Sequence, residues 1–211
     1  MGVFSILFGK YLLATNTISC GLMMAIGDIL QQRSEHWKRR HDHKYFPEQS
    51  LSQTIVQFES SGIENIVLEN VEETDLPYKH DFTRTRNMMA VGLIQGPFHH
   101  YFYIALDRYL PGRNTSSIFK KTFVDQAVAS PTCLGIFFFG LGLLESRDIK
   151  DINEEVKLKF FDTWKVDCCF WPPTQFINFL LVPVKYRVIY INLMTMIYDI
   201  FLSYIKYDAA F

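Results

Sequence analysis

Four aspartates lie within or at the edge of apolar segments, where an ionised carboxylate is costly unless it is paired or hydrated. They are Asp28, Asp107, Asp125 and Asp199. Gathered inside a helix bundle, such acids could line a polar, water-filled path that passes small solutes. They could equally form internal ion pairs that set the register of the helices, and the sequence favours neither reading. The arginines placed to pair with them are Arg84, Arg86, Arg108 and Arg187.

A second polar group lies in the apolar segment 170–187, FWPPTQFINFLLVPVKYR. Gln175 and Asn178 are three residues apart, so on a helix they share one face and could hydrogen-bond to a neighbouring helix. The prolines of the segment, at 172, 173 and 183, interrupt helical hydrogen bonding and predict a broken segment at a membrane. The alternative is a proline-kinked core helix of a soluble protein.

No enzymatic motif accompanies these groups. The sequence has no glycine-rich phosphate loop, no nucleophile elbow and no HExxH, so we expect neither catalysis nor a cofactor. His41 and His43 have no cysteine or carboxylate set at ligand spacing beside them, which argues against a metal site. The four cysteines show no CxxC spacing and are expected to be packing residues.

Four apolar segments are long enough to position these groups in a bilayer, and they cover residues 11–30, 87–106, 122–144 and 188–205. Residues 170–184 would form a half or full fifth span. The mean hydropathy is only +0.05, because polar residues are concentrated in loops, and the aromatic content of 16% suits lipid-facing surfaces. We therefore expect an all-α, polytopic membrane helix bundle forming one domain over residues 1–211.

The polar residues between the first two spans, 31–86, are expected to form a loop with a disordered insert at 47–80. A basic cluster opens this loop and could contact anionic lipid or RNA, although a juxtamembrane positive flank is the simpler reading. Loops 31–86 and 145–169 hold most of the lysine and arginine, which would place both on one face of the membrane. The candidate partner-contact residues of the cluster are Lys38, Arg39, Arg40 and Lys44.

Gly92 and Gly96 form a GxxxG pattern within the second apolar segment. Small residues at this spacing allow two helix backbones to approach closely. The pattern is common, so it predicts a helix contact without identifying the partner.

Several motifs along the chain resemble, in order, those of the twenty-two-kilodalton peroxisomal membrane protein family, also called the Mpv-seventeen family. They are GDILQQ (27–32), GPFHHYFYIALDR (96–108), KTFVDQAVASP (121–131), WPPTQFINFLLVPVKYR (171–187) and YDIFLSYIKY (198–207). The WPxxQxxNF and VPxxYR pair is the most specific of these. The resemblance covers nearly the whole chain outside the insert, and the insert departs from the compact first loop of most members.

The resemblance implies a four-helix integral protein of the inner mitochondrial or the peroxisomal membrane. One branch of the family, which this sequence is most similar to, is associated with assembly and stability of the mitochondrial ribosome and with mitochondrial translation. The partners implied are the lipid bilayer, the large subunit of that ribosome and a second copy of the chain. The alternative function is a channel for small solutes or metabolites.

The family motif positions are carried over residue by residue. Together with Asp199, the candidate motif and bundle-lining residues are Asp28, Asp107, Arg108, Asp125, Gln126, Trp171, Pro172, Gln175, Asn178, Pro183 and Arg187. The remaining motif positions are Gly27, Gly96, Pro97, Pro131 and Phe179.

Overall fold

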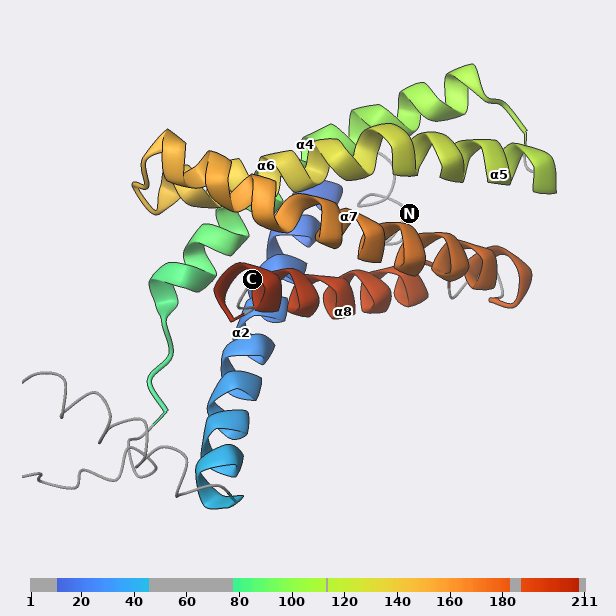
Figure 1. Cartoon of the computed structure of the whole chain (residues 1–211). Helices are drawn as coiled ribbons and strands as arrows, with labels where there is room; N and C mark the ends of the chain where they lie inside the picture. Colours follow the sequence, from blue (N-terminus) through green and yellow to red (C-terminus); the bar gives the residue numbers. More distant parts are fainter. Residues whose placement is uncertain (1–10, 46–77, 113, 183–186, 209–211) are drawn as a thin grey trace, which may run out of the picture.

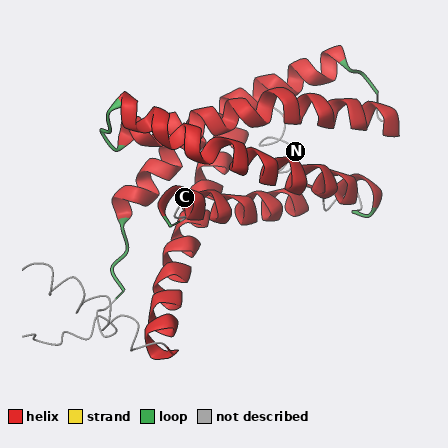
Figure 2. Cartoon of the chain, viewed as in Figure 1, coloured by secondary structure: helices red, strands yellow, loops and turns green. Residues whose placement is uncertain are grey.

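The computed structural model describes residues 11–45, 78–112, 114–182 and 187–208, and within these ranges all regular structure is helical (Figure 1, Figure 2). This confirms the predicted all-α class. The helices are α2 (Leu12–Tyr45), α4 (Phe82–Tyr109), α5 (Thr115–Val124), the π-helical turn η2 (Asp125–Ala129), α6 (Ser130–Leu144), α7 (Ile149–Leu180) and α8 (Arg187–Tyr207).

The described helices form a closed ring. α4 packs on α2 and on α6, α7 packs on α6 and on α8, and α8 packs back on α2. From α2 to α8, each helix along the ring runs opposite to the one before it, as α6 and α7 show in Figure 1, whereas α2 and α8 cross steeply. The chain therefore passes along the bundle five times within the described residues, with α5, η2 and α6 forming one continuous pass.

Glycines bring α2 and α4 into close contact. A Cβ added at Gly96 would lie 2.5 Å from the Cα of Thr17, and one at Gly92 would lie 2.8 Å from the Cα of Gly21. Only hydrogen fits at these positions, so the GxxxG pattern is confirmed as a helix contact, and its partner is α2.

The apolar core lies near the α6–α7 turn. Phe137, Phe138 and Leu141 of α6 have no exposed surface and form one cluster with Met24 of α2 and Met88 of α4. The backbones of α6 and α7 meet at Gly142, where an added Cβ would lie 2.5 Å from a side-chain carbon of Ile152. This core holds the ring together at one end.

The π-helical turn at Asp125–Ala129 has a local cause in Pro131. In the π-helix the N–H of Ser130 bonds to the carbonyl of Asp125, and the next such bond would need the missing N–H of Pro131. The carbonyl of Gln126 instead accepts a hydrogen bond of 3.1 Å from the indole nitrogen of Trp164. The sequence thus widens this helix by one residue at the point where Asp125 and Gln126 lie.

The predicted break in the segment 170–184 is wrong for its first two prolines. Helix α7 runs without interruption from Ile149 to Leu180 and includes both Pro172 and Pro173. Neighbouring rings fix this part of α7, because Phe170 and Trp171 pack against Tyr198 with centroids 5.4 and 5.5 Å apart. Tertiary packing therefore compensates for the two missing backbone donors. Pro183 lies outside the described residues.

The two predicted loops are also shorter than expected. Residues 31–45 continue helix α2, residues 82–86 begin α4, and residues 149–169 form the first part of α7. Their polar side chains gave no apolar periodicity, yet each stretch extends a helix that is anchored in the bundle. The insert at 47–80 lies outside the described residues except for 78–80, which are not helical.

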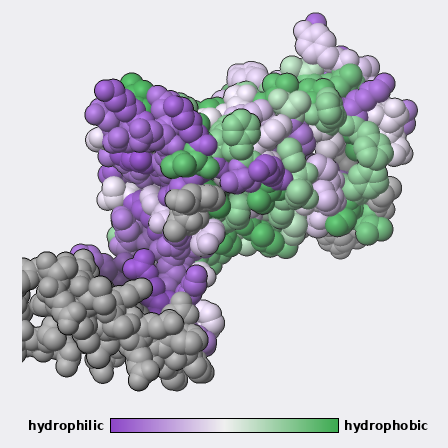
Figure 3. Space-filling model, viewed as in Figure 1, coloured by the Kyte–Doolittle hydropathy of each residue, from purple (hydrophilic) through white to green (hydrophobic). Residues whose placement is uncertain are grey.

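Two of the described helices are long and apolar enough to cross a membrane, Leu12–His41 and Thr115–Leu144. The expected four transmembrane helices stay a prediction. Figure 3 shows apolar side chains over the part of the bundle away from the α6–α7 turn, whereas polar side chains cover that turn and the lower part of α2. This separation of apolar and polar surface is typical of a bundle that is partly embedded in a membrane.

Candidate functional site

Asp28 forms the centre of a buried polar network that joins three helices. One carboxylate oxygen accepts hydrogen bonds from Arg84 Nε at 2.6 Å and Ser203 Oγ at 2.8 Å. The other accepts from Gln32 Nε2 at 2.8 Å and Thr85 Oγ1 at 2.5 Å. Asp28 has no exposed surface, so its charge is compensated entirely by protein groups.

Arg84 extends this network beyond Asp28. Its guanidinium donates two hydrogen bonds to Glu35, at 3.1 and 2.8 Å, and lies 4.1 Å from the ring centroid of Tyr207. This geometry combines a bidentate ion pair with a cation–π contact. The pairing of Asp28 with Arg84 confirms the ion-pair reading for this aspartate.

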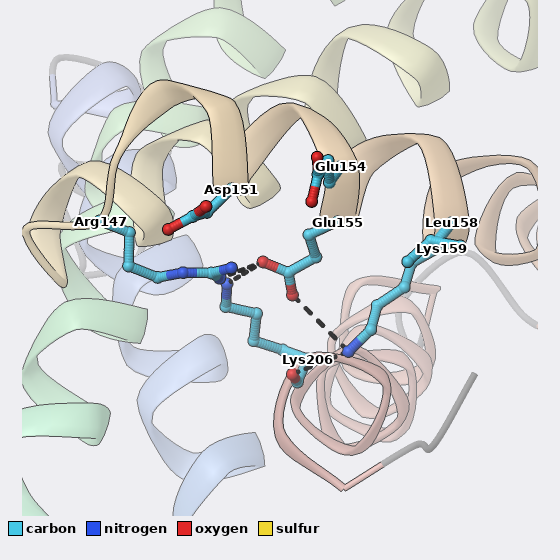
Figure 4. A pocket seen from close by; sticks show the side chains of 7 residues that line it. All are labelled: Arg147, Asp151, Glu154, Glu155, Leu158, Lys159 and Lys206. Atoms are coloured by element: carbon cyan, nitrogen blue, oxygen red, sulfur yellow. Dashed lines mark hydrogen bonds and ion pairs between the residues drawn. The ribbon is translucent and has the colours of Figure 1, made fainter.

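A second ion cluster lies beside the first and joins the α6–α7 turn to the end of α8 (Figure 4). Lys206 Nζ lies 2.8 Å from Glu155 and 3.4 Å from Glu145, and Arg147 also pairs with Glu155. Burial opposes the charge of Glu155, but the hydrogen bonds and charges of Lys206 and Arg147 outweigh it and lower its pKa. Lys159 donates to the last carbonyls of α8, those of Ile205 and Lys206.

The two networks form one charged end of the bundle, and they contact each other through Tyr207, whose hydroxyl donates to Glu145 at 2.7 Å. Their acids and cations are paired with each other. We therefore assign this end a structural role, in which it fixes the ring of helices. Asp28, expected as a bundle-lining residue, lies in this network and is not among the residues that line the cavity described next.

The ring holds a cavity of about 500 Å³. Side chains from α2, α4, η2, α6, α7 and α8 all line it, so it lies between the helices of the ring, and it is partly open to the outside. Such a volume lies within the range of small-molecule sites in proteins. Among the predicted site residues, those in the lining are Asp107, Asp125, Gln126, Trp171, Gln175 and Asp199.

Hydrogen bonds order part of the cavity wall. Asp125 accepts a bond of 2.9 Å from the Tyr103 hydroxyl, and Asp167 accepts one from the Ser130 hydroxyl. Gln95 donates to the carbonyl of Cys133 at 3.0 Å. These bonds hold polar side chains of different helices toward the same interior space.

Other polar atoms of the wall have no hydrogen-bond partner. Asp199 Oδ2 and Gln126 Oε1 are both buried acceptors of this kind, on residues that are 5% and 9% exposed. A buried polar group without a partner costs about 1–3 kcal/mol, and such groups are rare in native structures unless they serve a purpose. Their position in the cavity wall makes the cavity the candidate functional site.

The remaining predicted residues lie elsewhere. Asn178 is buried, with Oδ1 unpartnered, but is not in the cavity lining. Arg108 is exposed on α4, and Pro172 also lies outside the lining. Arg187 begins α8, and its side chain lies outside the description. Lys38, Arg39 and Arg40 are exposed near the end of α2, and Lys44 is in the same helix.

Several lining residues were not predicted from the sequence. Asp167 was not predicted because residues 145–169 were expected to form a loop, and Ser130 lies in an apolar segment without a motif around it. Tyr103, His99 and Tyr198 are aromatic residues in apolar segments, where packing is the ordinary role. One signal could have identified Asp167. It lies four and eight residues before Trp171 and Gln175, so on a helix the three side chains share one face.

Comparison with known proteins places the chain in a family. The model of the Mpv17 / PMP22 family matches residues 142–203, which include α7 and most of α8. No solved structure matches the chain.

Relatives from distant organisms match longer stretches. PXMP2/4 family protein 2 of Dictyostelium discoideum is 30% identical over 209 residues, 98% of this chain and 91% of the relative. Protein SYM1 of Candida glabrata is 34% identical over 131 residues, 60% of this chain and 62% of the relative. Peroxisomal membrane protein 2 of Bos taurus is 29% identical over 108 residues, 51% of this chain and 55% of the relative. The chain is therefore a membrane protein of the Mpv17 / PMP22 family.

Proposed function

We propose that the protein passes small polar solutes across an organellar membrane through the axis of its helix ring. The observation that carries the proposal is the cavity of about 500 Å³ with unpartnered acceptors in its wall. A bundle with only a structural role would fill its axis with apolar side chains, because interiors are close-packed. Buried polar groups that face a shared space are instead suited to a passing solute.

The membrane we propose is the inner mitochondrial membrane, and the alternative is the peroxisomal membrane. The SYM1 relative supports the first location, and the peroxisomal membrane protein of Bos taurus supports the second. Density-gradient fractionation of cells expressing the tagged chain decides between them. Co-migration with inner-membrane markers after removal of the outer membrane is the expected result, and co-migration with peroxisomal markers would overturn it.

Reconstitution tests the solute path directly. We expect purified protein to conduct in planar bilayers, and we expect Asp125→Asn and Asp199→Asn to change the conductance, because both residues line the cavity. Asp162→Asn on the outer face of α7 is the matched control and should conduct as the wild type does. Pure, correctly folded protein that conducts at no voltage would overturn the proposal.

A second candidate function is support of mitochondrial ribosome assembly and translation, through contact with the large ribosomal subunit. One observation favours it: the last turns of α2 extend away from the ring and carry exposed Lys38, Arg39 and Arg40 (Figure 1). A basic helix of this kind is complementary to RNA or to an acidic protein surface. This second function is compatible with a solute path, because the cavity and the last turns of α2 are separate parts of the chain.

Sedimentation of detergent-solubilised mitochondria tests this second function. Changing Lys38, Arg39, Arg40 and Lys44 together to glutamine should reduce co-sedimentation with the large subunit, and depletion of the protein should reduce assembled ribosomes. Lys150, Lys157 and Lys165, exposed lysines of α7, serve as the matched control when changed to glutamine. Full co-sedimentation of the variant with the four changes in α2 would exclude the last turns of α2 as the contact with the ribosome.

A further inference from the structure

The cavity wall is acidic and holds no lysine or arginine among the described residues that line it. It contains four aspartates, Asp107, Asp125, Asp167 and Asp199, from four different passes of the chain. Both histidines in the wall have neighbours, since His99 Nε2 lies 3.2 Å from Cys133 Sγ and Asn16 Nδ2 lies 3.3 Å from His100 Nδ1. The aspartates of the wall therefore have no lysine or arginine in the described lining to compensate them.

Three of these aspartates have partners. Asp107 pairs with Lys121 at 2.6 Å at the exposed edge of the cavity, and Asp125 and Asp167 accept hydrogen bonds from hydroxyl groups. Asp199 differs from them, because its Oδ2 has no donor although the residue is only 5% exposed. An ionised carboxylate in such surroundings is costly unless a positive charge accompanies it, and the described wall supplies none.

The backbone holds Asp199 in place. Gly27 of α2 lies against it so closely that an added Cβ would stand 2.7 Å from the Cβ of Asp199. The neighbouring Ser203, one turn further along α8, has no exposed surface and donates to Asp28. Asp199 is thus fixed by helix packing, and it belongs to the lining of the cavity.

The remainder of the wall is apolar and aromatic. Leu134, Ile191 and Leu202 could contact a hydrocarbon group, and the rings of Tyr103 and Trp171 could contact either a hydrocarbon or a cation. In the described ranges, no three histidine, cysteine or carboxylate side chains are arranged to hold a metal ion. The wall therefore suits a cation that donates hydrogen bonds and carries an apolar part better than it suits a bare metal ion.

We propose that the cavity binds small organic cations, namely protonated amines with an apolar tail, with the ammonium group at Asp199 Oδ2 and Gln126 Oε1 as a further acceptor in the same wall. The inference rests on the proposed function and specifies its solutes. It also predicts discrimination against anions such as carboxylates and phosphates, because no cationic side chain of the described wall would compensate their charge.

Binding to the full-length protein in nanodiscs of phosphatidylcholine tests the inference, because this lipid carries no net charge. Three probes of similar shape separate the effects of charge: phenethylamine, 2-phenylethanol and phenylacetate. By isothermal titration calorimetry we expect phenethylamine to bind at least tenfold more tightly than 2-phenylethanol, and phenylacetate to bind most weakly. Equal affinities for the three probes would overturn the inference.

The variant Asp199→Asn locates the site. It keeps the shape of the side chain and removes its charge, so we expect at least a tenfold loss of phenethylamine affinity with the affinity for 2-phenylethanol unchanged. Asp162→Asn, which removes an exposed acid from the outer face of α7, should bind phenethylamine as the wild type does. Unchanged phenethylamine binding to folded Asp199→Asn protein would exclude Asp199 as the ammonium site.

A measurement on the wild type keeps the inference testable if that variant does not fold. Cys20 and Cys133 line the cavity, whereas Cys169 is exposed outside the lining. Phenethylamine should slow the alkylation of Cys20 and Cys133 and leave Cys169 unaffected, and phenylacetate should protect none of them. Equal protection by the amine and the carboxylate would overturn the inference.

The two proposals fail separately. Solute conduction without preference for the amine would leave the proposed function standing and overturn the cation site. Amine binding at Asp199 in a protein that conducts at no voltage would leave the cation site standing and overturn the solute path.

Discussion

Single residues of one type take opposite roles in this protein. Asp28 and Asp199 are both buried aspartates within apolar helical segments, and they were predicted to be equivalent. Asp28 has four hydrogen-bond donors, one of them the guanidinium of Arg84, so it joins helices. Asp199 Oδ2 has no donor, and Asp199 belongs to the lining of the cavity. The surrounding helices, and not the residue type, determine whether the carboxylate supports the fold or a ligand.

Removal of Arg84 should therefore be severely destabilising. Arg84→Met leaves Asp28 buried without its cation, which costs about 3–5 kcal/mol in the free energy of unfolding. The double variant Asp28→Asn/Arg84→Met should recover part of this loss, because no unpaired charge remains. Unfolding of the purified protein in detergent measures both, and Arg108→Met, an exposed arginine on the same helix, is the control. A double variant no more stable than Arg84→Met would show that Asp28 is not the group left uncompensated.

The ion cluster around Glu155 predicts a dependence of stability on pH. The pKa of Glu155 is lower in the folded protein than its ordinary value of 4.5, so its ionised form stabilises the fold. This contribution is complete above pH 4.5 and is lost as the pH falls below that value and through the folded-state pKa.

Thermal unfolding at pH about 6 and about 3 checks this dependence. Glu155→Gln should lower the unfolding temperature at the higher pH. On acidification, the unfolding temperature of this variant should fall less than that of the wild type. Glu154→Gln changes a neighbouring exposed residue and should titrate as the wild type does. The same loss on acidification in Glu155→Gln and the wild type would assign the pH dependence to other groups.

At the level of the elements, small residues and one proline determine how the helices fit together. Gly92 and Gly96 permit the contact of α2 with α4, and Pro131 produces the π-helical turn that carries two cavity residues. Pro172 and Pro173, by contrast, leave α7 continuous. The carbonyl of Gln126, which Pro131 leaves without a helical donor, accepts a hydrogen bond from Trp164. The effect of a proline thus depends on the side chains that surround the carbonyl left without its donor.

The α2–α4 contact predicts opposite effects for two glycine substitutions. Gly96→Ala places a methyl group 2.5 Å from the Cα of Thr17, so the helices must separate, and we expect a loss of about 1–3 kcal/mol in stability. Gly135→Ala meets no atom within 4 Å and should stabilise α6 by up to about 1 kcal/mol through helix propensity. Unfolding measurements in detergent compare the two. A Gly96→Ala variant as stable as Gly135→Ala would contradict the close contact.

At the level of the whole molecule, the ring places its two ion networks, around Asp28 and around Glu155, at one end. The α6–α7 turn, the start of α4 and the end of α8 meet there, and the α4–α5 turn lies at the opposite end (Figure 1). Because α7 runs the length of the bundle, the end of α8 returns to the charged end. A bundle of this form would expose its two ends on opposite faces of a membrane.

Labelling with a membrane-impermeant maleimide tests this arrangement. In a variant whose native cysteines are replaced by serine, single cysteines at Ser146 and Lys38 should react from one side of sealed vesicles, and a cysteine at Ser116 from the other. All three positions are exposed. Reaction of all three from the same side would show that the bundle does not span the membrane as a unit.

The sequence alone determined the helical class, the family, the polar positions within apolar segments and the small-residue contact at Gly92 and Gly96. These depend on local composition, on spacing and on motifs that are read one segment at a time. It could not determine which acids are paired, that residues 31–45 and 149–169 extend helices, or that Asp167 joins Asp199 in one cavity. Those features were decided by the tertiary structure, because the partners of a buried charge come from helices far apart in the chain, and only the closed ring brings them together.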